Sequence, residues 1–213
     1  MYQLYYQPEG IWVGDIMPYG KEGQFYVYHQ RDTRNPGPFG EPFGWALATT
    51  KDFVDYKDYG ESLMRGTDEE ADQFIYAGSV FETEAGFHAF YTGYCLTAEF
   101  QQTICHATSE DGITWTKDIA NPVITPMTEL YEKLDWRDPY VFYNEEDENY
   151  WILISARRLD MPVTRRGCIV LYRSKNLKDW TYYGPIYSPG HTNCPECPEM
   201  YKMGGLTQDF QSL

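Results

Sequence analysis

One pattern recurs along the chain, and its clearest copy is Ala107-Thr108-Ser109-Glu110-Asp111-Gly112-Ile113-Thr114-Trp115. It reads as a β-strand that ends in a Ser or Thr, followed by a polar turn and an aromatic residue. The other two copies are Ala48-Thr49-Thr50-Lys51-Asp52-Phe53-Val54-Asp55-Tyr56 and Tyr172-Arg173-Ser174-Lys175-Asn176-Leu177-Lys178-Asp179-Trp180. The copies start at residues 48, 107 and 172, so the chain repeats itself about every 60 residues.

Two strand-like runs joined by a polar turn precede each copy. The paired runs cover residues 14–17 and 24–29, 78–82 and 87–91, and 140–143 and 150–155. Each repeat therefore holds about four strands, and four-stranded units repeated in sequence are typical of the blades of a β-propeller. A β-sandwich is the alternative all-β fold, but it predicts no repeat of this length. Helical periodicity is weak, and only residues 67–74 and 127–133 are predicted to form short helical turns.

The predicted fold class is an all-β propeller, and residues 1–213 are predicted to form a single domain that is incomplete at its C-terminal end. Three full units end near Gly184, and a fourth begins around residues 194–203. An open propeller exposes unpaired strand edges and apolar blade faces. We therefore expect the ring to be completed by further residues of a longer protein or by a partner chain, such as a second copy in a homo-oligomer.

Charge and composition narrow the classes of partner. The chain has 32 acidic and 17 basic residues and a net charge of −15, which disfavours nucleic acid because phosphates are bound by clustered Lys and Arg. No apolar run reaches the ~20 residues of a membrane span and no secretory signal is recognised, so a cytoplasmic location away from membranes is predicted. The five cysteines, an odd number, fit reduced thiols. Aromatic residues make up 17% of the chain, and rings beside carboxylates suit neutral sugars, although strands also favour aromatic residues.

Three acidic residues lie where the innermost strand of a repeat is expected to begin. They are Asp15, Asp138 and Glu196. Equivalent positions of separate blades converge at the axis of a propeller, so these carboxylates are predicted to meet. Cleavage of a glycosidic bond needs such a group of acids, one to attack or to activate water and one to protonate the leaving oxygen. The pattern therefore predicts a glycoside hydrolase that acts on an oligosaccharide or a disaccharide.

The segments around these acids resemble motifs of glycoside hydrolase family 32, the invertase, levanase and fructanase group. Residues 12–18, Trp-Val-Gly-Asp-Ile-Met-Pro, are similar to the family's Trp-x-Asn-Asp-Pro-Asn-Gly, while Arg137-Asp138-Pro139 matches its Arg-Asp-Pro and Glu196-Cys197-Pro198-Glu199 its Glu-Cys-Pro-Asp. The motifs also occur in the family's order. Shorter likenesses lie at residues 28–30, 45–50 and 76–79. The resemblance covers residues 12–203 and implies a five-bladed propeller domain.

This resemblance implies a role for each acid. Asp15 is then the nucleophile that forms a fructosyl-enzyme intermediate, Glu196 the general acid and later the base, and Asp138 a stabiliser that binds sugar hydroxyls. The implied activity is that of a β-fructofuranosidase working by retaining double displacement. The implied substrate-binding residues are Gln30, Trp45, Ser79 and Arg137, with Trp45 as a stacking wall and Arg137 as the partner of a neighbouring carboxylate.

Two other functions stay open. Gly14 stands where the family has Asn, and Ile16-Met17-Pro18 stands where it has Pro-Asn-Gly. The substrate can therefore differ, and a divergent arabinofuranosidase-like hydrolase is one alternative. A non-catalytic carbohydrate-binding propeller fragment is the other, because binding tolerates the loss of either working carboxylate whereas hydrolysis does not.

Cofactor and metal motifs are weak. His191, Cys194 and Cys197 have the spacing of three zinc ligands, but no fourth ligand is apparent nearby and the prolines beside the cysteines match the Glu-Cys-Pro motif. No phosphate-loop or dinucleotide-binding pattern occurs. The sequence therefore predicts neither a metal nor a cofactor.

Overall fold

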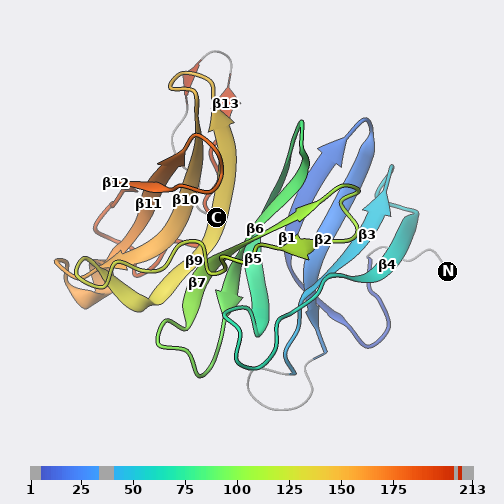
Figure 1. Ribbon diagram of the computed structural model, residues 1–213, viewed down its shortest axis with the longest axis horizontal. Helices are drawn as coiled ribbons and strands as arrows, with labels where there is room; N and C mark the ends of the chain where they lie inside the picture. The colour runs from blue at the N-terminus through green and yellow to red at the C-terminus, as the bar shows by residue number, and fades with distance from the viewer. Residues whose placement is uncertain (1–5, 34–40, 204–205, 208–213) are drawn as a thin grey trace.

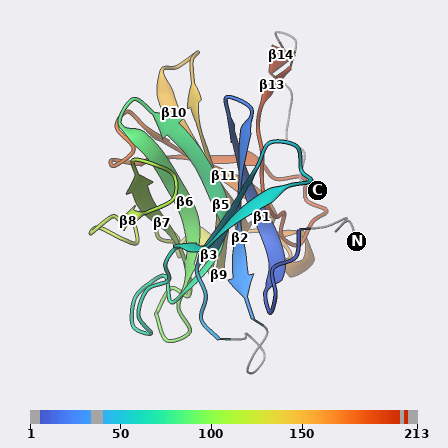
Figure 2. The same ribbon diagram turned by 90° about the vertical axis from the view of Figure 1, so that its right-hand side faces the viewer.

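Each of the three repeats folds into one four-stranded antiparallel sheet. The computed structural model describes residues 6–33, 41–203 and 206–207. The first sheet holds β1 (Trp12–Lys21), β2 (Gln24–Asp32), β3 (Trp45–Thr50) and β4 (Tyr56–Leu63); the second holds β5 (Phe74–Thr83), β6 (Gly86–Tyr94), β7 (Gln102–Ser109) and β8 (Thr116–Lys117); the third holds β9 (Tyr131–Asn144), β10 (Asn149–Arg158), β11 (Gly167–Ser174) and β12 (Thr181–Tyr187). In every sheet the order in sequence is the order in space, as in propeller blades. Figure 1 shows the sheets in blue to cyan, green, and yellow to orange, and Figure 2 shows them from the side.

The predicted strand pairs are confirmed. The hairpins β1–β2, β5–β6 and β9–β10 contain the paired runs read from the sequence, and each strand is longer than its run. A short hairpin of β13 (Lys202–Met203) and β14 (Leu206–Thr207) follows the third sheet. It lies where a fourth unit was predicted to begin.

The predicted helical turns are wrong. Residues 67–74 and 127–133 form hydrogen-bonded turns that run directly into β5 and β9. Phe74 and Tyr131 are buried at the starts of these strands, so tertiary packing overrides the local preference. Among the described residues the one helix is a 3₁₀ turn at Val163–Arg165. None of the described residues forms a helix long and apolar enough to cross a membrane.

One turn geometry explains why the nine-residue pattern repeats. Ser109 ends β7, and its Oγ accepts a hydrogen bond from Gly112 N at 2.9 Å. The Asp111 side chain accepts from the next two backbone groups, Ile113 N and Thr114 N, each at 2.8 Å, and such bonds close a turn locally. Corresponding turns are made by Thr50 with Asp52 and by Ser174 with Asn176. The residue after the Asp or Asn has a positive φ in all three copies, at Phe53, Gly112 and Leu177.

The first strands of the three sheets are neighbours, since β5 contacts both β1 and β9. Each carries a β-bulge, in which two residues lie opposite one residue of the next strand. The bulged pairs are Gly14-Asp15 in β1, Tyr76-Ala77 in β5 and Asp138-Pro139 in β9. A bulge interrupts the alternation of side chains along a strand, so it can re-aim a side chain toward the neighbouring strands. Two of the three predicted acids, Asp15 and Asp138, lie in these bulges.

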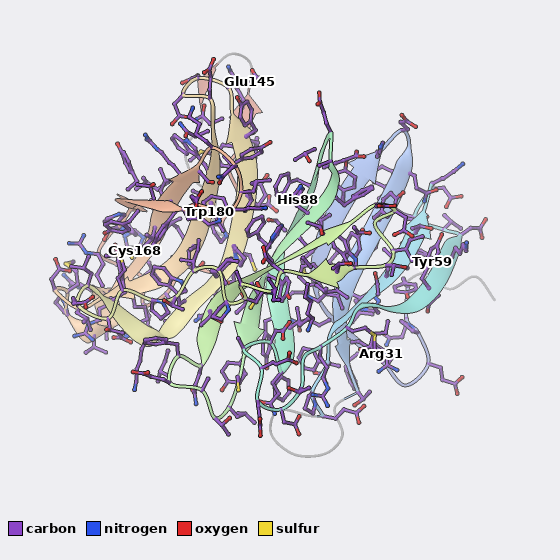
Figure 3. The ribbon with its side chains drawn as sticks, in the orientation of Figure 1. Arg31, Tyr59, His88, Glu145, Cys168 and Trp180 are labelled. Carbon is purple, nitrogen blue, oxygen red and sulfur yellow. The ribbon has the colours of Figure 1, made fainter. Side chains whose placement is uncertain are left out.

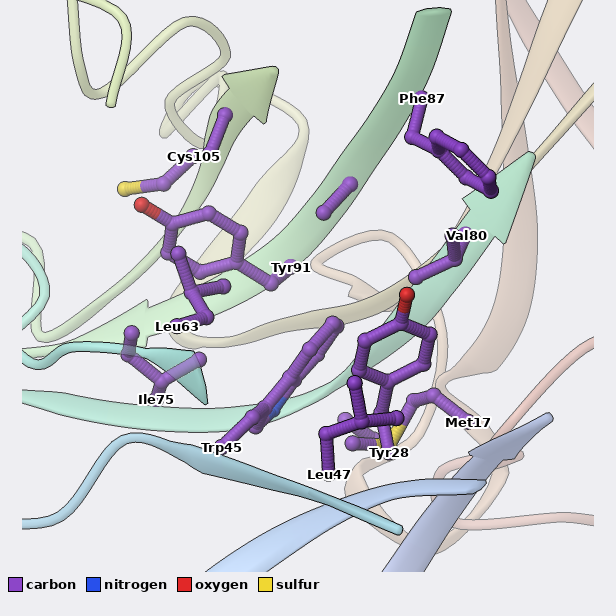
Figure 4. Close-up of a cluster of buried hydrophobic side chains, with 13 residues drawn as sticks. Met17, Tyr28, Trp45, Leu47, Leu63, Ile75, Val80, Phe87, Tyr91 and Cys105 are labelled. Carbon is purple, nitrogen blue, oxygen red and sulfur yellow. The ribbon is translucent and has the colours of Figure 1, made fainter. Parts of the chain in front are cut away.

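Aromatic residues fill the spaces between the sheets. Between the first and second sheets, the fully buried ring of Trp45 lies 5.9 Å from that of Tyr91 and 6.2 Å from that of Tyr28, measured between centroids. Figure 4 shows these rings in contact with Leu47 and Ile75. A second cluster, containing Phe90, Trp136 and Tyr172, fills the space between the second and third sheets. Much of the high aromatic content therefore serves packing between blades.

A partly buried chain of hydrogen bonds lies at the interface of the second and third sheets. His88 Nδ1 is 3.0 Å from His106 Nε2, and His106 Nδ1 is 3.1 Å from Asp118 Oδ2. At the other end, Thr83 Oγ1 is 3.2 Å from His88 Nε2. All three contacts are satisfied when each Nδ1 carries a hydrogen and each Nε2 accepts one, which makes both imidazoles neutral. In Figure 3 the labels of His88 and Trp180 mark the two sides of this interface.

Acid is expected to weaken this interface. Burial lowers the pKa of His88 to about 4, and the neighbouring His106 acts in the same direction. A histidine whose pKa falls on folding stabilises the fold above its unfolded pKa of 6.5 and loses that contribution as the pH falls toward 4. We expect the difference in unfolding free energy between wild type and His88→Asn, measured in urea, to shrink over this range. A difference that stays constant with pH contradicts the neutral pair.

Candidate active site

The structure brings the three predicted acids into one pocket, beside the bulges of the first strands. Asp15, Asp138 and Glu196 line a pocket of about 320 Å³, together with Tyr76, Tyr94, Gln102, Arg137 and Cys197. This pocket adjoins a cleft of about 980 Å³ that runs along β1, β5 and β9, and Asp15 and Asp138 line both. Convergent polar groups at the end of a large cleft are typical of a small-molecule site.

Asp15 is an exposed acid of the group. The bulge of β1 places it opposite Gln30, whose Nε2 donates to Asp15 Oδ2 at 2.8 Å. Gln30 is itself buried, so this bond holds the carboxylate from the protein side. Gly14 leaves room for the amide, because a Cβ on residue 14 would lie 2.6 Å from Gln30 Oε1. Gln30 therefore contacts the predicted nucleophile directly.

Asp138 is the buried acid, with 7% of its surface exposed. Its N–H donates to Thr92 Oγ1 at 2.8 Å, and its Oδ2 accepts from Cys197 N at 3.1 Å. Asp138 and Cys197 both precede a proline and have positive φ values of 56° and 48°. This conformation costs about 1–3 kcal/mol for a residue with a side chain, and such strain gathers at functional sites. The backbone is therefore held in place where the Arg-Asp-Pro and Glu-Cys-Pro motifs meet.

The electrostatic surroundings of Asp138 oppose its ionisation. Burial raises the pKa of Asp138 to about 6, against the bond from Cys197 N and the charge of Arg137, and the carboxylates of Glu196 and Asp15 also raise it. A pKa near 6 places the change of charge close to neutral pH. Perturbed acids of this kind, in a pocket with charged neighbours, are typical of active sites.

Asp138→Asn is expected to stabilise the fold at neutral pH. A carboxyl whose pKa rises on folding favours the folded state below its unfolded pKa of about 4, and that contribution is lost as the pH rises through about 6. The amide avoids the burial of a charge, so the unfolding free energy at pH 7 is expected to increase by about 1–3 kcal/mol. Urea denaturation at pH 7 and pH 4 measures this gain. An equal gain at pH 4 would show that titration is not its cause.

Arg137 connects the carboxylates of Glu196 and Asp138. Its Nη2 donates to Glu196 Oε1 at 3.0 Å, and its Nε lies 3.8 Å from Asp138 Oδ2. The Glu196 side chain is 65% exposed, whereas that of Arg137 is 17% exposed. The predicted contact between Arg137 and a neighbouring carboxylate is present, and it joins a fixed cation to an acid that a ligand can reach.

The last two predicted substrate-binding residues differ in position. Ser79 lines the larger cleft, and its Oγ accepts from Val141 N at 3.0 Å. Trp45 lies in the core instead, where its Nε1 donates to Tyr76 O at 2.9 Å. A ring without exposed surface cannot stack on a sugar, so the prediction of Trp45 as a stacking wall is wrong. β3 is the third strand of its sheet, behind the strand that faces the cleft.

Three residues of the smaller pocket were missed by the sequence analysis. Tyr76 lies in the bulge of β5, Tyr94 ends β6 and Gln102 begins β7. The rings of Tyr76 and Tyr94 form a T-shaped contact at 5.7 Å. Tyr76 belongs to the same short likeness as Ser79, which offered a signal. No local pattern marks Tyr94 or Gln102, because sheet pairing alone brings them to the pocket.

The cysteines considered as zinc ligands take part in this arrangement. Cys194 Sγ accepts from Arg137 Nη2 at 3.4 Å, and Cys197 N donates to Asp138. Burial raises the pKa of both thiols to about 12, so the free thiols carry their protons at neutral pH. Across residues 6–33 and 41–203, no three His, Cys, Asp or Glu side chains are placed to hold a metal ion.

Known proteins are similar to this chain in sequence. The family model described as "Glycosyl hydrolases family 32 N-terminal domain" matches residues 5–211. The levanase of Bacillus subtilis (strain 168) is 30% identical over 219 residues, which cover 94% of this chain and 29% of the levanase. The extracellular exo-inulinase inuE of Aspergillus niger is 29% identical over 233 residues, which cover 94% of this chain and 41% of the inulinase. The chain therefore spans less than half the length of these relatives.

Solved structures share the fold. Fructan 1-exohydrolase IIa from Cichorium intybus matches with a TM-score of 0.78 at 23% identity, over 92% of this chain and 36% of that one. The fructofuranosidase from Schwanniomyces occidentalis, complexed with fructose, matches with a TM-score of 0.73 at 25% identity, over 92% of this chain and 38% of that one. The prediction of an all-β propeller is confirmed.

Proposed function

The chain belongs to glycosyl hydrolase family 32, and from this premise we propose that it carries the working acids of a β-fructofuranosidase-like glycoside hydrolase. The observation that carries the proposal is the meeting of Asp15, Asp138 and Glu196 in one pocket. Three carboxylates that lie close together repel one another, so a fold keeps them together only where a function uses them. Glycosidic cleavage with retention is such a function, because its nucleophile and its acid/base lie only ~5–5.5 Å apart. Activity, substrate and assembly of the whole protein belong to this proposal.

The first step is attack by Asp15 on the anomeric carbon of a fructofuranoside. One Asp15 oxygen is held by Gln30, which leaves the other to form the bond to carbon. Glu196 gives its proton to the leaving oxygen as the glycosidic bond breaks, so a fructosyl ester of Asp15 remains. Glu196 then takes a proton from water, the water oxygen attacks the same carbon, and the Asp15 carboxylate is released.

Asp138 and Arg137 act around this exchange. Asp138 lies beside the reacting groups and is fixed by Cys197 N, so its remaining oxygen can accept sugar hydroxyl hydrogens as charge develops on the ring. Arg137 donates to Glu196, and this charge-assisted bond holds the side chain that acts in both steps. Ser79 and the Tyr76–Tyr94 pair line the space where the sugar is expected to lie.

The substrate is proposed to be a fructan or a fructose-containing disaccharide. Two relatives, a levanase and an exo-inulinase, support the fructan class by their names. The cytoplasmic location and the homo-oligomer stay predictions, and relatives named extracellular give the first of these no support.

A panel assay tests the proposal. The chain is incubated with levan, inulin, sucrose and aryl arabinofuranosides beside a Glu196→Gln control, and the assembly mass is measured on the same sample. Release of fructose by the wild type and not by the control supports the proposal. Release of arabinose instead favours the divergent hydrolase, and tight sugar binding without release by a folded sample favours the binding fragment.

A further inference from the structure

A line of alternating charges leads from Arg166, the residue before β11, to the candidate active site. Arg166 Nη1 lies 2.5 Å from Glu132 Oε1, and Glu132 Oε1 lies 3.3 Å from Arg157 Nη2. Arg157 Nη1 lies 3.5 Å from Asp135 Oδ2, and Asp135 Oδ1 accepts from Arg137 Nη1 at 2.8 Å. The line therefore ends on the guanidinium that contacts Glu196.

The strand geometry explains this line. Asp135 and Arg137 are two residues apart in β9, so their side chains start from the same face of the strand. Opposite them, β10 pairs Ala156 with Trp136 and Arg158 with Tyr131. Residues 132–135 of β9 therefore lie opposite the single residue Arg157 of β10. The Arg157 side chain contacts both acids of this stretch, Glu132 and Asp135. The irregularity of β9 gathers charges that a regular ladder would keep apart.

Arg157 is held firmly. Its side chain is 12% exposed, and its Nη2 also donates to Val163 O at 3.0 Å. A guanidinium that contacts two acids and a carbonyl has little freedom, because its donors form a rigid planar fork. The Asp135 side chain, which is 21% exposed, is therefore held by Arg157 at Oδ2 and contacts Arg137 through Oδ1.

Arg137 has few other fixed partners. Its Nη1 lies 3.3 Å from Gln102 Oε1, a long neutral bond. Its Nη2 contacts the Cys194 thiol at 3.4 Å and Glu196, whose side chain is largely exposed. Asp135 is thus the short, charged and anchored contact of this guanidinium. Without it, the exposed carboxylate of Glu196 would draw the cation toward solvent and away from Asp138.

We propose that Asp135 and Arg157 are positioning residues, which together hold the Arg137 guanidinium between Glu196 and Asp138. The inference rests on the proposed function for its meaning in catalysis. Its structural content is independent of turnover, because Asp138 itself reports where the cation lies.

The experiment follows the titration of the Asp138 carboxyl by carbon NMR in the full chain, with Asp138→Asn to assign the signal. Asp135→Asn and Arg157→Lys are the test variants. Removal of the Asp135 charge alone would lower the pKa of Asp138, whereas displacement of Arg137 raises it. Arg157→Lys keeps the charge and loses the fork, so its effect reports position alone. We expect the midpoint to rise by roughly half a pKa unit or more in both variants.

Asp147→Asn is the matched control. Asp147 forms an ion pair with Arg173 at 3.4 Å in the same sheet, with side chains 28% and 30% exposed, and it lies at the hairpin away from the pocket. Near-ultraviolet circular dichroism checks that all variants are folded. A midpoint that stays or falls in Asp135→Asn, or that rises equally in Asp147→Asn, overturns the proposal.

Turnover separates this inference from the proposed function. If the wild type releases fructose, kcat in Asp135→Asn is expected to fall on the order of tenfold with little change in KM, since the substrate contacts remain. A raised midpoint in a chain that hydrolyses nothing supports the positioning role and counts against the proposed function. An unchanged midpoint in an active enzyme leaves the function standing and rejects the positioning role.

Discussion

Asp15→Ala is expected to lower kcat for fructose release by roughly 10⁴-fold or more. The variant is compared with a wild-type preparation that releases fructose in the panel assay. In the proposed mechanism the Asp15 carboxylate forms the bond to the sugar, and no other residue in the pocket takes this role. Gln30, its fixed partner, remains and can still bind the sugar. KM is therefore expected to change far less than kcat. The comparison is made by initial-rate kinetics on sucrose and inulin.

Two controls separate the nucleophile from a residue that merely supports the site. Asp160→Ala removes an exposed acid that pairs with Arg158 at 2.6 Å on the third sheet, and such a surface pair contributes little. Added azide should restore turnover in Asp15→Ala by attacking from the vacated side, which gives an inverted fructosyl azide. In Glu196→Ala, by contrast, it should give a retained product. Full activity of Asp15→Ala, or a retained azide product from it, contradicts the assigned role.

Trp45→Ala is expected to lower the unfolding free energy by about 3–5 kcal/mol. The ring is completely buried between two sheets, and its removal leaves a cavity beside Tyr28 and Tyr91 as well as a lost bond to Tyr76 O. Urea denaturation followed by fluorescence measures the change, and Trp45→Phe should lose less because part of the volume is kept.

Trp12→Ala is the matched control for this prediction. Trp12 is 60% exposed in β1, so its loss should cost a few tenths of a kcal/mol in stability. If Trp45→Ala proved as stable as Trp12→Ala and instead weakened sugar binding, the ring would be a sugar wall after all and the core assignment would fail.

Local patterns predict the blades well, for a physical reason. The Ser/Thr and Asp/Asn residues of the repeated turn make bonds to backbone groups two or three residues away, so the fold there depends on neighbours in sequence. The hairpins are equally local. The meeting of Asp15, Asp138 and Glu196 was also predictable, because repeats place equivalent segments at one axis.

Other features depend on residues far apart in the chain. Trp45 was placed in the pocket by its motif, yet its burial depends on how the second sheet closes over β3. The anchoring of Arg137 depends on an irregular stretch of β9 pairing with Arg157, which no periodicity reveals. The local sequence favours helical turns that include Phe74 and Tyr131. Tertiary contacts instead bury both residues in strands.

The bulges in β1, β5 and β9 have a consequence for how such an enzyme can evolve. A bulged residue has no cross-strand partner of its own, so replacing its side chain leaves the pairing of the strands intact. Tyr76 occupies such a position, and it lines the pocket together with Asp15. Changes of substrate preference can therefore arise at Tyr76, while the strand pairing that positions Asp15 stays intact.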